Sequence, residues 1–523
     1  MESSEIGLSQ LKVSGPDYSE LLRISLNAAI FAVLGPEEII TGLFLADLLG
    51  VLWPESGEDV WAEIKSKVED MINQKMDAAL YEQVVEDLMG LQNVANDYIS
   101  SINDGYNVSE VLVRWISLNS FILNAKPHFQ TKGSEFLLLP LFAQFANLEF
   151  AILRDMVGYG SSWGCSDKEV LDYKTKLSSY IKEYTTYVDK VYSDKLSTIN
   201  PAPGQHRLEP FMSRNKITRE TTLSVLDYKE LWKYLDLNDY PTPPDVIVLD
   251  REIYSDPFGT ADDNGISIPS KPSNPPSGIT IWGWDRVDAI QVDYEVGKGP
   301  GGITSTGRMG DVVRPDNHGG TTGGSNQPPH GGSWKFTTDP ITHLPQHGGF
   351  VDAVMVYSGS IVNGIQLRFG GIPAAPGTWS NLCGGYGSTN TMLEYSSHYV
   401  SSIKVMGASH YYGSADCVVF GFKIHPILKP ETSSFSVSSN TVSVGGSVTA
   451  TFTGFMREGA TYDWGFEAEY PHPAISKEQI SGVGGGPYVV TFTSTGTYNI
   501  TLVVTSSTGQ IFTSILSTIL VTN

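Results

Sequence analysis

Three His-Gly-Gly triplets are the residues of this sequence whose types best suit metal or sugar chemistry. They begin at His318, His330 and His347. Histidine is a common metal ligand, and glycine lets a backbone approach a ligand closely. Glycine also supplies the positive φ angles that turns in long loops require. No cysteine lies near the triplets, so we expect turns here, with no metal and no cofactor. His318 and His330 stay candidates for sugar or receptor contact.

Aromatic side chains in the second half of the chain could stack on sugar rings or anchor a protein receptor. The candidates are Trp282, Trp284, Trp334, Tyr386, Tyr411 and Tyr412. Ordinary packing at the ends of strands explains any one of them equally well. The aromatic residues therefore predict a recognition surface only as a group.

Catalytic signatures are missing from the sequence. It contains no P-loop and no His-Glu-x-x-His motif. Asp and Glu residues in the second half are scattered, and nothing in the sequence places two of them together as a glycosidase pair would require. We therefore expect that the protein is not an enzyme.

One apolar stretch is expected to form the core around which the other helices pack. Residues 137–160 read LLLPLFAQFANLEFAILRDMVGYG, and Glu149 is the only ionisable side chain between Leu137 and Leu153. A helix that is apolar on every face must lie inside protein or inside lipid. About 20 helical residues span roughly 30 Å, the hydrocarbon thickness of a bilayer. Because Gln144, Asn147 and Glu149 suit a permanent anchor poorly, we expect a core helix that can later enter a membrane. A purely structural core helix is the alternative.

Two residues of this stretch raise specific expectations. A buried Glu149 needs a partner inside the protein, and Arg114 and Arg154 are the candidate cations. Pro140 is expected in or near the first turn of the helix, where a missing N–H costs nothing.

Amphipathic helices are predicted on both sides of this stretch, along residues 1–240. Apolar residues three or four apart run from Leu80 to Ile102, and a further helix is predicted from about Val108 to Ala125. Ser166-Asp167-Lys168-Glu169 forms a capping box that opens another helix. A last helix is predicted over 208–235. Six or seven amphipathic helices around one apolar helix make a bundle.

From about residue 243 the composition changes to Gly, Ser, Thr, Pro and aromatic residues, and alternating runs replace the helical period. The runs in the middle of the chain are 289–296, 333–338, 351–357, 361–369, 400–405 and 418–424. They predict an all-β domain that ends at a linker over 427–432. Residues 433–523 alternate again, and about seven short strands there predict a small β-sandwich of the immunoglobulin or PKD type.

Length, charge and cysteine content bound the function. A chain of 523 residues should hold two to four domains. The net charge of −23 makes nucleic acid an improbable partner and gives no attraction to anionic lipid. Three scattered cysteines form neither a disulfide framework nor a zinc site. The N-terminus lacks the basic-then-apolar pattern of a secretory signal, so we expect a soluble product in the cytoplasm or in an inclusion.

Several motifs of the first half resemble the helical domain of the three-domain delta-endotoxins, the Cry insecticidal crystal proteins. The motifs, in chain order, are WPESGEDVWAEIKSKVEDMINQKM, DLMGLQNVANDY, FAQFANLEFAILRD with YGSSWG, ITRETTLSVLDYKELW, and DYP followed by DREIYSDP. They cover residues 20–258 in the family's order and near its spacing. The resemblance implies a membrane-inserting bundle over 1–242.

The second half resembles the same family less closely. VDAIQVDYEVG, VNGIQLRFGG and VVFGFKI are similar to a jacalin-like β-prism, which is also the fold of the family's second domain. We assign 243–428 to this β-prism, and Asp416 loosely fits the Gly-then-Asp spacing of a jacalin sugar loop. The segment 429–523 is shorter than the family's usual jelly-roll third domain.

The resemblance implies a multidomain pore-forming toxin. A gut protease would trim the N-terminus, prism loops would bind an epithelial protein or glycan receptor, and the hairpin 108–127 with 137–159 would insert into the target-cell membrane. Oligomers of the chain would then open a pore. The alternative is a lectin-like adhesion or defence protein with the bundle as scaffold.

The residues to which the resemblance assigns insertion or pore roles lie on that hairpin: Arg114, Asn119, Asn124, Pro140, Asn147, Glu149, Arg154 and Asp155. Arg114, Asn119 and Asn124 are expected to face the lumen. Glu149 stands where the family most often has His, and Arg154-Asp155 resembles a structural ion pair at the end of the family's central helix. The receptor or glycan set is Trp282, Trp284, His318, His330, Tyr411, Tyr412 and Asp416.

Overall fold

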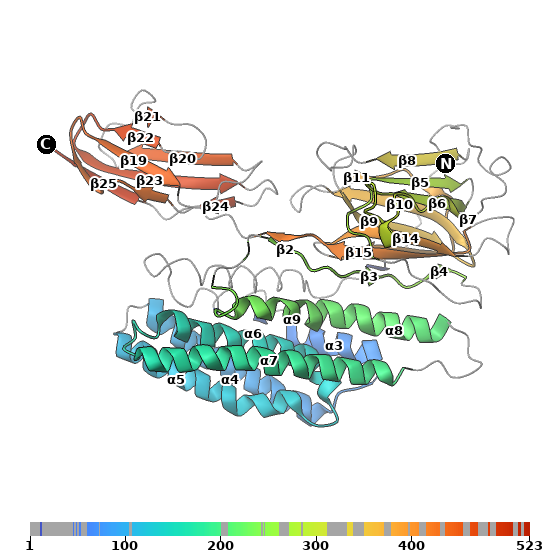
Figure 1. The fold of residues 1–523 in the computed structure, drawn as a ribbon, viewed down its shortest axis with the longest axis horizontal. Coiled ribbons are helices and arrows are strands. Elements are labelled where there is room, and N and C mark those ends of the chain that lie inside the picture. Colours follow the sequence, from blue (N-terminus) through green and yellow to red (C-terminus); the bar gives the residue numbers. More distant parts are fainter. Residues whose placement is uncertain are drawn as a thin grey trace, which may run out of the picture. The chain divides into compact units, whose positions relative to one another are not determined.

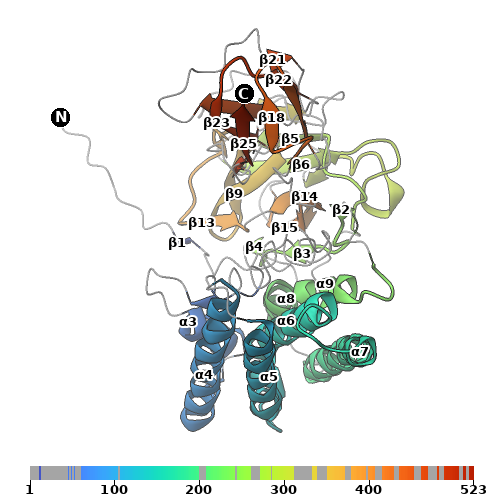
Figure 2. The ribbon, with the colours of Figure 1, turned by 90° about the vertical axis from the view of Figure 1, so that its left-hand side faces the viewer.

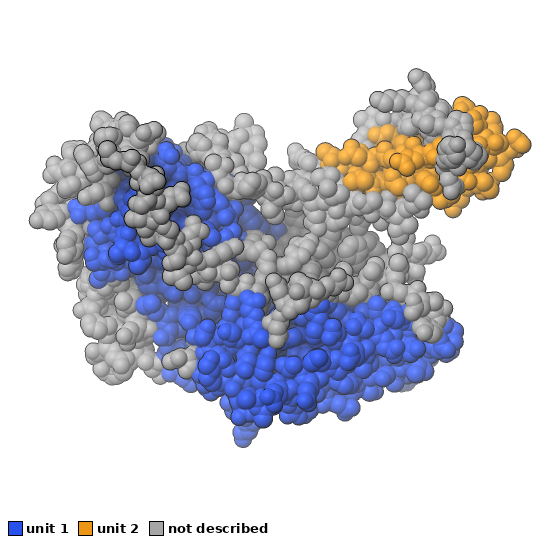
Figure 3. Space-filling view, turned by 180° about the vertical axis from the view of Figure 1, so that it is seen from behind, with its two compact units in different colours: residues 1–371, 377–428 blue, residues 372–376, 429–523 orange. Residues whose placement is uncertain are grey.

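The computed structural model of the chain forms two compact units. Unit 1 comprises Met1–Gly371 and Gly377–Leu428, and unit 2 comprises Ile372–Pro376 and Lys429–Asn523 (Figure 3). The structure describes residues 11–12, 45, 49, 52–53, 60–72, 74–103, 107–199, 208–241, 244, 246–260, 271–283, 286–310, 332–337, 350–370, 378–395, 398–406, 415–428, 435–452, 461–468, 480–481, 488–505, 511–513 and 517–523. The predicted domain boundaries after residues 242 and 428 stay predictions.

A bundle of helices forms the first part of unit 1 (Figures 1 and 2). Its elements are α3 (Val60–Ile72), α4 (Ala78–Asn103), α5 (Val108–Ala125), the 3₁₀ helix η1 (Lys126–Gln130), α6 (Glu135–Tyr159), α7 (Asp167–Ser197), α8 (Leu208–Thr221), the π-helix η2 (Thr222–Leu226), α9 (Asp227–Trp232) and the 3₁₀ helix η3 (Lys233–Leu235). Figure 2 looks roughly along these helices, with α6 inside the bundle. Helix α6 contacts α3, α5, α7 and α9.

The predicted central helix is confirmed as the core of this bundle. Every residue of α6 from Leu137 to Met156 is buried. Apolar side chains of the surrounding helices share one core with α6, such as Val84, Leu88 and Leu91 of α4 and Leu177, Ile181 and Tyr184 of α7. Burial of apolar surface contributes about 25 cal/mol per Å² to stability. A helix with no polar face therefore takes the centre.

Local sequence signals set the helix ends. The capping box at Ser166 is confirmed, because its side chain accepts from the Glu169 amide and Glu169 bonds back to the Ser166 amide. Asn107 caps α5 through a single bond, because its side chain accepts from the Glu110 amide. Pro140 is the sixth residue of α6, which begins at Glu135, so it lies in the second turn, next to the first turn near which it was expected. The predicted last helix exists, but a π-helical turn interrupts it between α8 and α9.

Three β-sheets of unit 1 share one hydrophobic core and form the predicted β-prism. The first has the order β1-β13-β9-β10-β11, with β12 beside β10; the second has β14-β15-β3, with β4 beside β15; the third has β7-β6-β5-β8. The strand bounds are β1 Leu11–Lys12, β3 Ile253–Tyr254, β4 Phe258–Gly259, β5 Gly278–Gly283, β6 Val287–Asp293, β7 Met309–Gly310, β8 Gly332–Thr337, β9 Phe350–Ser358, β10 Val362–Gly370, β11 Thr378–Trp379, β12 Cys383–Gly384, β13 Thr389–Glu394, β14 His398–Met406 and β15 Cys417–Ile424.

The predicted linker over 427–432 is partly wrong. Ile427 and Leu428 form strand β16, which pairs with β2 (Val246–Ile247). The pairing joins the chain that enters the prism to the chain that leaves it. Because the contact links positions 180 residues apart in the sequence (Ile427 and Ile247), no local pattern indicates it.

Unit 2 is the predicted β-sandwich, with nine described strands where about seven were expected. One sheet has the order β17-β19-β22-β21 and the other β18-β25-β23-β20, with β24 beside β23. The bounds are β17 Phe435–Val437, β18 Thr441–Ser443, β19 Ser447–Phe452, β20 Thr461–Ala468, β21 Ile480–Ser481, β22 Tyr488–Thr491, β23 Gly496–Thr505, β24 Ile511–Thr513 and β25 Ser517–Thr522. Val448, Val490 and Ile500 belong to a core that side chains of both sheets form.

Candidate functional site

The buried carboxylate of Glu149 has a partner that sequence reasoning missed. Tyr184 of α7 donates its hydroxyl to Glu149 Oε2. Neither Arg114 nor Arg154 pairs with it, so the expected ion pair is wrong. Glu149 Oε1 accepts no hydrogen bond within the described part of the chain. Burial is the main cause that raises the pKa of Glu149, while the Tyr184 bond and Lys126 act in the opposite direction.

Lys126 links the α5–α6 connection to α7 beside this carboxylate. Its Nζ lies 2.9 Å from Glu183 Oε1 and 4.4 Å from the centre of the Tyr184 ring. It also lies 4.7 Å from the Tyr180 ring, which stacks on Tyr184. A cation over an aromatic ring adds about 0.5–2 kcal/mol. Residues 126, 183 and 184 thus hold the hairpin against α7.

Tyr184→Phe should destabilise the bundle by about 1–3 kcal/mol, because it leaves a buried carboxyl oxygen without its donor. The midpoint of thermal unfolding followed by circular dichroism measures the loss. Tyr180→Phe is the matched control, because its ring stacks on Tyr184 but its hydroxyl does not bond Glu149. Equal midpoints for the two variants would assign no stabilising role to the Tyr184–Glu149 bond.

Arg154 and Asp155 were expected to pair with each other, and this is wrong. Arg154 Nη1 donates to the backbone oxygen of Leu235 at 3.0 Å, at the end of the bundle's last helix. Asp155 Oδ2 accepts from the Tyr98 hydroxyl of α4 at 3.1 Å. Burial raises the pKa of Asp155 to about 7, against the opposing effects of Tyr98 and Arg154. The two side chains therefore fasten the C-terminal end of α6 to two different helices.

Asn147 in the middle of α6 has hydrogen bonds at both ends of its side-chain amide, whereas the buried Gln144 Nε2 has no partner among the described residues. Asn147 Oδ1 accepts from Trp232 Nε1 of α9 at 2.8 Å, and Asn147 Nδ2 donates to Gln144 at 3.2 Å. The hydrogen bond between Trp232 and Asn147 therefore fixes the position of α9 against α6. Asn147 was predicted as an insertion residue, and no sequence signal indicates Trp232 as its partner.

Helix α5 carries the three residues expected to face a pore lumen. Arg114 Nη1 pairs with Asp97 of α4 at 3.2 Å, Asn119 is buried and Asn124 is exposed. Exposed apolar side chains lie on the same helix: Val113 at 66%, Ile116 at 49% and Leu123 at 37%. The exposed positions between 111 and 125 are Val113, Ile116, Ser117, Ser120, Leu123 and Asn124, and none of them is charged. One hairpin helix thus has an uncharged outer face.

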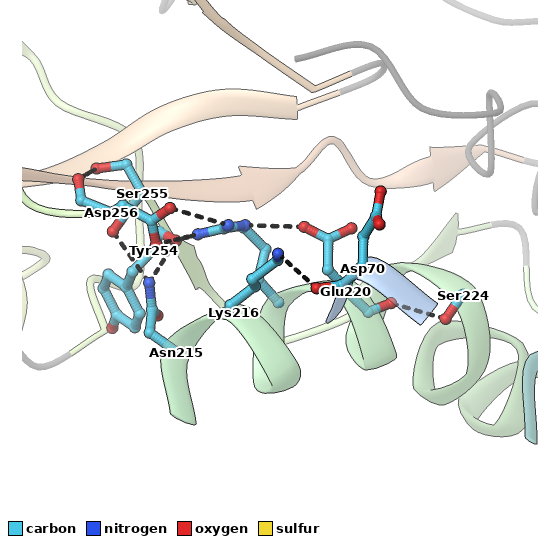
Figure 4. A network of polar contacts seen from close by, with 9 residues as sticks. Asp70, Asn215, Lys216, Glu220, Ser224, Tyr254, Ser255 and Asp256 are labelled. Atoms are coloured by element: carbon cyan, nitrogen blue, oxygen red, sulfur yellow. Dashed lines mark hydrogen bonds and ion pairs between the residues drawn. The ribbon is translucent and has the colours of Figure 1, made fainter. Parts of the chain in front are cut away.

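A polar network joins the bundle to the prism at α8 (Figure 4). Arg219 Nη1 donates to the backbone oxygen of Tyr254 at 2.9 Å and to Asp256 Oδ1 at 3.1 Å. Asn215 Nδ2 donates to the backbone oxygens of Tyr254 and Ser255 at 3.1 and 3.0 Å. These contacts bind the last helix to strand β3 and the chain that follows it.

A second set of contacts reinforces this junction at α9. Arg251 donates through Nε to Asp227 Oδ1 at 2.9 Å and through Nη2 to Oδ2 of the same residue. The Nη1 atom of Arg251 lies 2.8 Å from His398 Nε2 at the start of β14. Asp227 and His398 are both buried. Movement of the bundle away from the prism must break these bonds.

The expected receptor residues divide into two groups. Trp284, His318, His330, Tyr411 and Tyr412 lie outside the described residues, as do the triplets at 318 and 347. Trp282 lies within strand β5 rather than in a loop, and Asp416, before β15, is 4% exposed. Of the other aromatic residues, Tyr386 is exposed, whereas Trp334 is buried in the prism core, so its expected exposure is wrong.

Residues 160–164, Gly-Ser-Ser-Trp-Gly, match the Gly-x-Ser-x-Gly pattern of hydrolase nucleophiles, so the expectation that the sequence lacks this catalytic pattern is wrong. The pattern requires a turn from a strand into a helix, whereas these residues connect α6 to α7. Ser162 Oγ donates to the Tyr159 backbone oxygen at 2.7 Å. The match is a turn between helices.

Metal and disulfide chemistry find no support in the part of the chain that the structure describes. No group of three or more His, Cys, Asp or Glu side chains could hold a metal ion among these residues. Cys165, Cys383 and Cys417 are free thiols. Of the described helices, α6 alone is long and apolar enough to cross a bilayer, a property that core helices of soluble proteins share.

The helical part of the chain matches a known family. Residues 30–236 match the family model of the delta endotoxin N-terminal domain. Pesticidal crystal protein Cry1Id of Bacillus thuringiensis is 32% identical over 243 residues, which are 45% of this chain and 33% of that protein. Cry26Aa of Bacillus thuringiensis subsp. finitimus is 31% identical over 223 residues, which are 41% of this chain and 19% of that protein. The match therefore spans a third or less of these relatives' length.

Solved structures share the fold over a larger part of the chain. The Bacillus thuringiensis insecticidal crystal protein Cry7Ca1 has a TM-score of 0.60 at 17% identity, over 96% of both chains. The insecticidal delta-endotoxin Cry8Ea1 of Bacillus thuringiensis has a TM-score of 0.59 at 20% identity, over 78% of this chain and 74% of that chain. At these identities the likeness establishes a common fold.

Proposed function

The chain belongs, through its helical domain, to the delta-endotoxin family, and from this premise we propose that it is a pore-forming toxin that kills insect gut cells. The relatives and the solved structures carry the words pesticidal, insecticidal and mosquito-larvicidal in their names. In this proposal the protein acts at the plasma membrane of the target cell. It needs a protein or glycan receptor, an activating gut protease and assembly into a homo-oligomer.

The observation that carries the proposal is the burial of every residue of α6 from Leu137 to Met156. A helix with no polar face gains nothing from contact with water, and the residues 137–156 are all inside the bundle. Its hydrogen bonds are internal, so it can move from protein to lipid without losing them. Glu149, at the bilayer centre, costs about 2.5–3.5 kcal/mol on insertion scales unless it faces protein or water. We therefore infer that Glu149 faces another helix or the lumen after insertion.

Helix α5 is the second member of the inserting hairpin. Val113, Ile116 and Leu123 already face outward in the folded protein, so this side of the helix needs no rearrangement to contact lipid or another helix. The connection between α5 and α6 is short, since only η1 and four further residues separate them. A compact helix pair can enter a membrane as one unit.

The experiment that tests the proposal is planar-bilayer conductance before and after protease treatment, together with dye release from liposomes. A toxin gives discrete channels and leakage. The rival interpretation, a lectin-like binding protein, gives attachment to cells without leakage. Protease-treated protein that attaches to gut cells and never conducts would favour the rival.

Arg114→Glu should move the reversal potential of the channel in a KCl gradient toward the equilibrium potential of K⁺. The reason is that a charge on the lumen wall selects against ions of the same sign. Lys190→Glu is the matched control, because it makes the same charge change on the exposed side of α7. If both variants shift the potential equally, or neither does, α5 does not line the lumen.

A further inference from the structure

We propose that the outer face of the prism sheet β7-β6-β5-β8 (Figure 1) binds an acidic polysaccharide, through Trp282, Arg308 and Lys335. The proposal deepens the proposed function and rests on it for its biological role, because it gives receptor contact a place and a chemical class. The sheet face is distinct from the long loops where the aromatic residues first suggested recognition.

Strand register places the three side chains on one face. Ile279 and Ile281 of β5 belong to the prism core, so the alternating residues Thr280 and Trp282 point to the outer side. Trp282 pairs directly with Ala289 of β6 and Ser333 of β8. Paired residues share a face, so a small side chain flanks the indole on each side.

The adjacent row across the sheet is polar. Thr280 pairs with Gln291 of β6 and with Lys335 of β8. Arg308 directly precedes β7, whose Met309 packs against the core, so Arg308 faces outward. The backbones of Arg308 and Lys335 therefore belong to opposite edges of this sheet, and Trp282 and the hydrogen-bonding side chains come from the strands between them.

Arg308 is held in place by Trp282 rather than by an acidic side chain. The guanidinium carbon lies 4.7 Å from the centre of the indole ring. Its Nε is buried and donates no hydrogen bond to any described residue. A guanidinium stacked on an indole keeps its planar donors available for a carboxylate or a sulfate.

Both cations lack a carboxylate partner in the described part of a chain that is strongly acidic. No ion pair of Arg308 or Lys335 is found there, and Lys335 is exposed. The whole sequence has 57 acidic and 34 basic residues, so two cations on one sheet face with no carboxylate partner among the described residues are a specific arrangement. Asp293, at the next row, accepts hydrogen bonds from Gln291 and Ser305 at 2.8 and 2.6 Å. Both donors are neutral, so Asp293 keeps its charge, and Arg308 and Lys335 outnumber this carboxylate on the described part of the face.

The side chains of this face favour an acidic sugar over a simple anion. The Arg308 guanidinium lies over Trp282 of β5, and β5 is the strand next to β8, which carries Lys335. A carboxylate or sulfate group can interact with the two cations. The indole, Gln291 and Ser333 suit the rings and hydroxyls of a sugar, which a free phosphate or sulfate lacks. Sulfated and uronic-acid polymers share this chemistry.

The test measures binding of the full-length protein to heparin, which is sulfated, to polygalacturonate, which is carboxylated, and to neutral dextran. Wild type should bind at least one acidic polymer, bind dextran far more weakly, and lose affinity as NaCl rises. Arg308→Gln and Lys335→Gln should each weaken that binding by about tenfold, as expected for loss of a charge-assisted contact. Trp282→Ala should weaken it too, and Trp282→Phe should retain most of it.

Lys298→Gln is the matched control, because it removes one positive charge from an exposed turn of the same prism. If Lys298→Gln weakened polysaccharide binding as much as the other variants do, the overall charge of the protein would explain the effect, and the proposed site would be overturned. Equal binding of dextran, or unchanged binding by the Arg308 and Lys335 variants, would overturn it as well. If the Arg308 and Lys335 variants lost attachment to anionic phospholipid vesicles but bound the polysaccharides like wild type, the face would be a membrane contact and the glycan proposal would be rejected. Leakage from uncharged liposomes tests the pore independently, so the two proposals can fail separately.

Discussion

A covalent link between positions 126 and 183 should reduce channel conductance to that of a protein-free bilayer. Lys126 and Glu183 touch across a 2.9 Å ion pair, so cysteines at these positions can be joined by a short bis-maleimide with a cleavable centre. The link ties the α5–α6 connection to α7, and the hairpin then cannot leave the bundle. Planar-bilayer recording before and after cleavage of the crosslinker measures the effect, and cleavage should restore conductance.

The controls separate immobilisation from the substitutions themselves. The uncrosslinked Lys126→Cys/Glu183→Cys protein should conduct like wild type. The same crosslinker between cysteines at positions 168 and 172 joins neighbours on one helix, since Lys168 and Asp172 are four residues apart on α7. All variants carry Cys165→Ser, because this thiol is only partly buried. Full conductance of the locked protein would reject insertion of this hairpin.

Raising the pH from about 4 to 8 should destabilise wild type relative to Asp155→Asn by on the order of 4 kcal/mol. Burial raises the pKa of Asp155 from 3.8 to about 7 in the folded protein. The unfolded chain therefore loses this proton first, so folding stability falls as the pH rises from about 4 to about 7. Above that range the full cost of a buried charge is present. Asparagine keeps an acceptor for Tyr98 and has no charge to gain.

Thermal unfolding midpoints of both proteins between pH 4 and 8 check this result. The difference between the two should grow with pH and level off above about 7. Asp172→Asn, on the exposed side of α7, is the control and should leave the curve of wild type unchanged. The pKa of Glu149 is also raised, so this residue makes folding stability fall with rising pH in every variant. Its effect is common to all curves and does not change the difference between them. Parallel curves for Asp155→Asn and wild type would contradict the buried-charge explanation.

The bundle could be predicted in detail because its signals are local. The apolar run 137–156 needs no partner to be recognised, and the Ser166 capping box lies within four residues. The bounds of α5 agree with the predicted ones, because Asn107 precedes the helix and Lys126-Pro127 follows it. Alternation likewise located six of the eight described prism strands that have six or more residues, and it missed β5 and β13.

The polar partners could not be predicted, because they come from distant parts of the chain. Glu149 and Tyr184 are 35 residues apart, and Arg154 and Leu235 are 81 apart. Opposite charge predicted the wrong partners. A tyrosine hydroxyl bonds Glu149 where an arginine was expected, and a backbone oxygen bonds Arg154 where a carboxylate was expected. The two cations near Trp282 escaped notice for the same reason, because only the strand register brings Arg308 and Lys335 to one face.

Leu223 of the π-helix has a consequence for how this architecture can be recombined. Its side chain packs against both the core of the bundle and the core of the prism. An exchange of the prism for that of a relative must therefore rebuild the surroundings of Leu223 and the bonds of Arg219 and Arg251. The core of unit 2 is made from its own strands, as far as the structure describes them. Evolution and protein engineering can thus replace the C-terminal sandwich as a module, while the bundle and the prism have to be inherited as a pair.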